Sequence, residues 1–128
     1  MNILDARSFA IEFRLTGPAW ALDKFIPILS IQSKIGSSGG CGPGKLGDWL
    51  VPDTVYGLSI KPACYIHDCR YYDADTGDKR FAADKELFDN AERIIRLKSR
   101  NKLMVWLRMS RLLKYYAAVD ICGGGFTT

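Results

Sequence analysis

The sequence predicts a small, mainly α-helical domain. Its 128 residues are enough to bury one hydrophobic core. Apolar side chains recur at helical spacings in residues 80–97 and 103–116, whereas strand patterns are weak and are best at residues 54–60. We therefore expect a single domain, 1–128, with an N-terminal arm (1–35), a central core (36–98), and a basic helix with a tail (99–128).

The first third of the chain shows little regular patterning. Residues 1–33 are apolar with Pro18 and Pro27 as breaks, which favours short helices or an irregular arm. Glycines and Pro43 then predict a loop that extends to about Pro52.

Two antiparallel helices are expected in the central core. Pro62 suits the first turn of a helix carrying residues 64–72, and the polar run 73–78 has the turn chemistry that ends it. A second helix over residues 80–97 has one face that is apolar except for a single aspartate. That face consists of Phe81, Asp84, Leu87, Phe88, Ala91, Ile94 and Ile95. A break at 99–102 precedes a third helix that begins near Leu103.

Positive charge is concentrated in the last third of the chain. The formal net charge is only +4, which by itself does not indicate a nucleic-acid-binding protein. Eight basic residues nevertheless occur in a stretch without any acidic residue, namely Arg93, Arg96, Lys98, Arg100, Lys102, Arg108, Arg111 and Lys114. Such a block favours an anionic partner such as a lipid surface, although two solvated helix faces explain it equally well.

Four cysteines allow two disulfides, which suits an oxidising compartment and favours a secreted or otherwise extracytoplasmic protein. The N-terminal residues do not form a secretory signal, because Asp5, Arg7 and Glu12 interrupt any apolar stretch. No run reaches the length of a membrane span, since Arg108 and Arg111 break the stretch 103–113.

The single histidine, His67, stands beside Asp68 in the run Cys-Tyr-Ile-His-Asp-Cys-Arg-Tyr at 64–71. On a helix these two side chains point about 100° apart, so we expect each to contact a different group. Histidine can take a proton from water, and does so best when a carboxylate holds its other ring nitrogen. Asp84 is the best candidate, because an aspartate on an apolar face needs a buried partner. An equally good alternative is that Asp84 stabilises the first turn of its helix.

A glycine-rich loop, Gly-Gly-Cys-Gly-Pro-Gly at 39–44, precedes this helix. Glycine tolerates the backbone conformations that turn successive carbonyls toward one point, and Ca²⁺ accepts backbone carbonyl ligands readily. The same loop can present N–H groups to an oxyanion. A glycine-rich loop by itself is more often a flexible connector. It indicates a calcium site only in combination with the His-Asp motif downstream.

Together, Cys41-Gly42-Pro43-Gly44 and Cys64-x-x-His67-Asp68-x-x-Tyr71 resemble the motifs of the secreted phospholipase A2 superfamily. The Gly-Pro-Gly sequence, with Ala63 ahead of the His-Asp motif, is also similar to the phospholipase A2 domains of parvovirus capsid proteins. The resemblance covers about residues 39–97. It implies calcium-dependent hydrolysis of the sn-2 ester of glycerophospholipids at an anionic bilayer or micelle surface, with 36–98 as the catalytic core and no nucleic-acid partner.

The resemblance also implies a metal site and two disulfides. The carbonyls of Gly40, Gly42 and Gly44, with the Asp68 carboxylate, would bind Ca²⁺. A Cys41–Cys64 disulfide would link the loop to the helix, and a Cys69–Cys122 disulfide would link the tail to it.

The catalytic roles implied by the resemblance fall on four residues. His67 would activate water and Asp84 would orient His67, while Tyr71 would hydrogen-bond Asp84. The Gly42 N–H would stabilise the oxyanion together with Ca²⁺. The chain departs from the family where Ala63 replaces a cysteine and where the basic third helix has no counterpart.

Three other interpretations stay open. Cys41, Cys64, His67 and Cys69 have the chemistry of zinc ligands, which with the basic helix would suggest a nucleic-acid-binding module. An EF-hand-like loop over 73–84 would bind calcium, although its glycine is displaced and its last acidic ligand is an aspartate. A catalytically silent, lipid-binding member of the same fold is the third.

Overall fold

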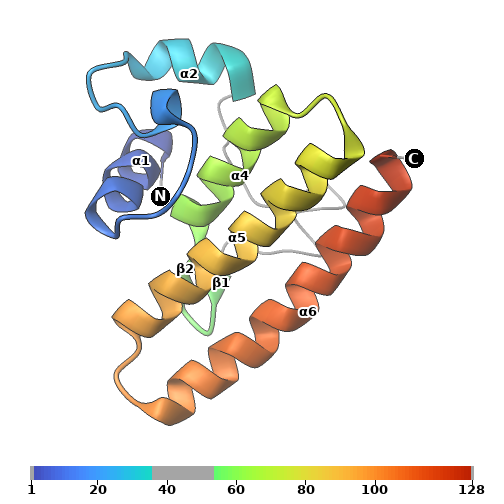
Figure 1. Cartoon of the computed structure of the whole chain (residues 1–128). Helices are drawn as coiled ribbons and strands as arrows, with labels where there is room; N and C mark the ends of the chain where they lie inside the picture. The colour runs from blue at the N-terminus through green and yellow to red at the C-terminus, as the bar shows by residue number, and fades with distance from the viewer. Residues whose placement is uncertain (1, 36–53, 128) are drawn as a thin grey trace.

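The computed structural model describes residues 2–35 and 54–127, with side chains of the last helix described as far as Lys114 and at Ala117. Within these ranges the chain is mainly helical, as the sequence predicts (Figure 1). The helical elements are α1 (Ile3–Glu12), the 3-10 turn η1 (Ala19–Ala21), α2 (Ile28–Ile35), α4 (Lys61–Asp73), α5 (Gly77–Lys98) and α6 (Lys102–Thr127). A short hairpin consists of β1 (Thr54–Val55) and β2 (Leu58–Ser59).

Helices α4, α5 and α6 form the central layer, each returning beside the one before it (Figure 1). The turn after α4 spans residues 74–76, so α5 is antiparallel to α4, as expected. Helix α6 then packs along α5 in the opposite direction. Both predicted central helices are confirmed, and the third begins at Lys102, close to the predicted Leu103.

Local chemistry explains where these helices begin. Pro62 lies in the first turn of α4, where its missing N–H costs no hydrogen bond. The side chain of Thr76 caps α5 by accepting from the backbone N–H of Lys79. Asn101 accepts from the N–H of Met104 at 2.9 Å and starts α6 in the same way.

The N-terminal residues pack against α4. Ile3, Ala6 and Ala10 of α1 are buried in the core. The Tyr65 hydroxyl donates to the Ala21 carbonyl, which joins the middle of α4 to η1. Residues 2–35 thus contribute to the same core as the central helices, as their position against α4 in Figure 1 also shows.

Residue Asn90 joins the N-terminal segment to α5. Its amide oxygen accepts from the Thr16 N–H at 3.0 Å, and its amide nitrogen donates to the Thr16 carbonyl at 2.8 Å. This two-way pairing satisfies a buried side chain and an extended backbone segment at once.

The predicted strand candidate at 54–60 is a two-stranded antiparallel hairpin that pairs Thr54 with Ser59 and Val55 with Leu58. Tyr56 (φ 46°) and Gly57 (φ 79°) form its turn, and two successive positive φ values are the signature of a type I′ hairpin. Among the described residues, no helix is both long and apolar enough to cross a membrane.

Candidate active site

The centre of the site is a buried contact between α4 and α5. The His67 Nε2 atom lies 2.7 Å from Asp84 Oδ1, and both side chains are almost fully buried. His67 comes from the middle of α4, while Asp84 comes from the third turn of α5 on the face that packs against α4. The predicted contact between Asp84 and His67 is therefore present. The alternative role of Asp84, stabilising the first turn of α5, is not needed to explain why an aspartate is buried at this position.

Tyr71 completes the arrangement from one turn further along α4. Its hydroxyl donates to the same Asp84 Oδ1 atom at 2.7 Å. Its ring lies 4.4 Å from the His67 ring, centroid to centroid, with a 40° tilt between the planes. The i, i+4 spacing on α4 places the two rings one above the other, so both can reach one carboxylate on the facing helix.

These contacts fix the orientation and the proton of the imidazole. A carboxylate only accepts hydrogen bonds, so the Nε2 atom that faces Asp84 carries the proton. The lone pair then resides on Nδ1, where it can accept a proton from water. Two donors on Asp84 compensate the burial of its charge. A histidine held in this way can act as a general base.

Asp68, the predicted carboxylate ligand for Ca²⁺, lies on α4 next to His67 and is partly buried. Carboxylate oxygens suit a hard cation. Because Asp68 points about 100° away from His67 around the helix, it does not compete with Asp84 for contact with His67. The other predicted ligands, Gly40, Gly42 and Gly44, lie outside the described residues, as does the expected oxyanion donor, the N–H of Gly42. Asp68 is therefore the one predicted calcium ligand among the described residues, and the calcium site stays a prediction.

An ion pair that the sequence did not predict braces the same two helices. Arg70 Nε and Nη2 donate to the two carboxylate oxygens of Glu86 at 3.0 and 3.2 Å. Thr16 donates to Glu86 as well, so the N-terminal segment joins this contact. The only signal for this ion pair in the sequence was the presence of opposite charges near His67 and Asp84. Because such charges are common on protein surfaces, they did not single out Arg70 and Glu86.

The predicted Cys69–Cys122 disulfide is wrong, because Cys69 is a free, buried cysteine. Its side chain lies on the face of α4 that carries Tyr65, which packs toward η1 and the N-terminal segment rather than toward α6. Burial raises the pKa of the Cys69 thiol to about 12, which leaves it protonated and unreactive. Cys64 is disulfide-bonded. Its predicted partner, Cys41, lies outside the described residues, so that pairing stays a prediction.

The zinc interpretation finds little support in this geometry. His67 Nε2 is taken by Asp84, Cys64 is disulfide-bonded, and Cys69 is a buried thiol that contacts Tyr65. Across residues 2–35 and 54–127, no group of three or more His, Cys, Asp or Glu side chains is placed to hold a metal ion.

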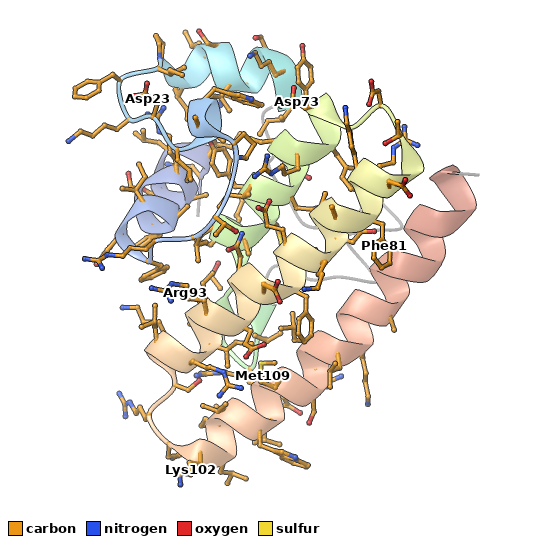
Figure 2. The ribbon with its side chains drawn as sticks, viewed as in Figure 1. Asp23, Asp73, Phe81, Arg93, Lys102 and Met109 are labelled. Carbon is orange, nitrogen blue, oxygen red and sulfur yellow. The ribbon has the colours of Figure 1, made fainter. Side chains whose placement is uncertain are left out.

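The EF-hand-like interpretation of residues 73–84 is also unfavourable. Asp73 accepts from Trp20 Nε1 at 3.0 Å, on the side of α4 that faces α2 (Figure 2). Asp75 pairs with Lys79 at 2.8 Å, and this contact lowers the pKa of its carboxyl. Residue 84, the supposed last ligand, is buried against His67. The three carboxylates therefore point to three different partners.

No protein-family model, curated protein or solved structure matches this chain.

Proposed function

We propose that the protein is a calcium-dependent, phospholipase A2-like hydrolase that cleaves the sn-2 ester of glycerophospholipids. The observation that carries the proposal is the contact of His67 and Tyr71 with one oxygen of Asp84 across two antiparallel helices. The glycine-rich loop, the His-Asp motif and the facing aspartate follow one another in the chain in the order that the resemblance implies. The resemblance of these motifs to the phospholipase A2 superfamily supports the substrate class.

In the proposed reaction, His67 Nδ1 takes a proton from water as the water oxygen attacks the ester carbonyl. Asp84 stabilises the imidazolium that forms and keeps the ring oriented. The tetrahedral intermediate then collapses, and His67 returns the proton to the departing glycerol oxygen. The products are a fatty acid and a lysophospholipid.

Asp68 and the carbonyls of Gly40, Gly42 and Gly44 would hold the Ca²⁺ ion. The chemistry that bound calcium supplies is polarisation of the ester carbonyl and stabilisation of the oxyanion. The Gly42 N–H would donate to that oxyanion as well.

Hydrolysis of phospholipid liposomes, with calcium and with a chelator, tests the proposal. The His67→Gln variant should lose about 10²- to 10⁴-fold in rate, because glutamine can still contact Asp84 but cannot act as a base. The matched control is Lys85→Gln, an exposed side chain next to Asp84 on α5, which should retain full activity. Activity that survives chelation, or that persists in His67→Gln, would contradict the mechanism.

The same assay separates the alternatives. A folded protein that binds liposomes and never hydrolyses them would be a silent member of the fold. A zinc-binding module would contain stoichiometric zinc by elemental analysis. Chelation would release that zinc, and thiol titration would then detect Cys64 as a free thiol. The proposed hydrolase contains no bound zinc.

A further inference from the structure

Helix α6 carries an apolar stripe on its exposed surface. Leu103, Trp106 and Leu113 are separated by three and seven residues, which places them along one side of a helix. Their exposed fractions are 64, 64 and 56%. Among the described residues, these three large apolar side chains are exposed to solvent on the same helix. We call them the α6 stripe.

The stripe is additional to the face that α6 uses for folding. Leu112 is buried, and Val105 and Met109 pack against the core, so α6 already has its contact with the rest of the molecule. Figure 2 shows Met109 in the first half of this helix, where α6 runs beside α5, and Lys102 at its lower end, just after the turn from α5. Three large apolar side chains outside the core contact are more than a solvent-facing helix surface needs.

Exposed lysines lie at both ends of the stripe. Lys102 precedes Leu103, and Lys114 follows Leu113; both lysines are exposed. Arg100 is exposed in the turn before α6, and the chain has no acidic residue from Arg93 to Lys114. Arg111 instead lies over the Tyr56 ring at 5.4 Å, so its guanidinium faces the hairpin rather than the stripe.

This charge pattern decides between the occupants of the surface. A second copy packed on the stripe would bring the two sets of lysines and arginines together at low separation, which is unfavourable. An anionic lipid bilayer instead offers apolar chains to Leu103, Trp106 and Leu113 and negative head groups to the basic residues around them. Tryptophan suits the boundary between the two regions.

We propose that the α6 stripe, with the basic residues around it, is the surface by which the protein docks on anionic membranes. The inference deepens the proposed function by naming the lipid surface, and it rests on that function for its biological meaning. Docking itself requires neither calcium nor hydrolysis, so it can be tested while the active site is silent.

The test is flotation of the full chain with vesicles in the presence of a chelator. Phosphatidylcholine vesicles are compared with matched vesicles that contain phosphatidylserine. The double variant Trp106→Gln, Leu113→Gln should bind the anionic vesicles on the order of tenfold more weakly. Since both side chains project from the core, its circular dichroism and thermal unfolding should match those of the unmodified chain.

The chain offers a matched control for the apolar substitutions. Phe25 and Leu29 are even more exposed, at 83 and 75%, yet they lie near the start of α2, away from α6 (Figure 1). The double variant Phe25→Gln, Leu29→Gln should bind anionic vesicles like the unmodified chain. If this variant loses binding and the α6 variant keeps it, the proposed surface is wrong.

Charge substitutions test the choice of anionic lipid. Lys102→Gln with Lys114→Gln should weaken binding to phosphatidylserine vesicles on the order of tenfold and leave the weak binding to phosphatidylcholine unchanged. The control is Lys79→Gln with Lys85→Gln on α5, which changes the net charge equally. Equal losses in the two pairs would show a response to net charge alone and would overturn the proposal.

Sedimentation analysis addresses a second copy as the occupant. The proposal expects a monomer at the concentrations used for flotation. A dimer that dissociates in the Trp106→Gln, Leu113→Gln variant, together with no vesicle binding by the unmodified chain, would overturn it. In either case hydrolysis of dispersed short-chain substrate remains a separate measurement, so failure of docking is distinguishable from failure of the proposed activity.

Discussion

Helices α4 and α6 have opposite relations to the rest of the molecule. α4 is enclosed on both sides, with His67 and Tyr71 directed to α5 and Tyr65 and Cys69 directed to the N-terminal segment. α6 has one buried side and leaves apolar and basic side chains to solvent on the other. Substitutions in α4 should therefore change catalysis or stability, whereas those on the outer side of α6 should change only what the protein binds.

The largest effect should come from Asp84→Asn, which tests the side of α4 that faces α5. An asparagine amide can donate to His67 Nε2, which would move the imidazole proton to Nδ1 and remove the base. The rate of ester hydrolysis should fall about 10²- to 10⁴-fold, because the tautomer is wrong although the shape is retained.

The comparison variant for Asp84→Asn is Lys114→Gln on α6, assayed on dispersed substrate so that membrane docking does not enter. It should retain the full rate. A loss of less than about tenfold in Asp84→Asn would mean that Asp84 only packs against His67 and does not set its tautomer.

Gly17→Ala should have an intermediate effect, because it tests the opposite side of α4. A Cβ atom at this position would lie 2.8 Å from Ile66 Cγ2, and Ile66 is fully buried. The free energy of unfolding should fall by about 1–3 kcal/mol, measured by urea denaturation.

Gly77 provides the matched control, since a Cβ atom there would meet no heavy atom within 4 Å. Gly77→Ala, in the first turn of α5, should be neutral or stabilising by up to about 1 kcal/mol. Equal destabilisation by the two substitutions would contradict the close packing of residues 2–35 on α4.

The effect that is smallest at neutral pH should be a loss of stability that develops only at alkaline pH. An exposed thiol in the unfolded chain ionises near about pH 9, whereas burial raises the pKa of Cys69 to about 12 in the folded protein. Between these values the unfolded state loses a proton that the folded state keeps, so stability falls as pH rises. The expected slope is about 1.4 kcal/mol per pH unit.

Burial also raises the pKa of Tyr65, which adds to this loss at the high end of the range. Urea denaturation between pH 8 and pH 11 measures the slope, and Cys69→Ala should make it shallower above about pH 9. An unchanged slope in that variant would show that Cys69 is not enclosed between α4 and the N-terminal segment.

Much of the secondary structure could be predicted because its signals are local. Pro62 marks the start of α4, the polar residues after Asp73 mark its end, and the apolar spacing of residues 80–97 marks α5. The single aspartate on an otherwise apolar face was sufficient to select Asp84 as a partner for His67, although not to exclude a role in the first turn of its helix.

Other features had no local signal. The Cys69–Cys122 disulfide was predicted from a family pattern, and it failed because the direction of Cys69 depends on which side of α4 meets the N-terminal segment. The Arg70–Glu86 ion pair and the two hydrogen bonds between Asn90 and Thr16 join residues far apart in the chain, so spacing alone could not reveal them.

The sequence by itself determined the helical class, the approximate positions of α4 and α5, and the residue types of a candidate hydrolytic site, because periodicity, capping and turn chemistry act over a few residues. Only the tertiary structure decided that His67 and Tyr71 meet on one oxygen of Asp84, and that Leu103, Trp106 and Leu113 remain outside the core. The physical reason is that burial and hydrogen-bond pairing depend on how helices pack. Packing is set by contacts between residues that the chain brings together only when it folds.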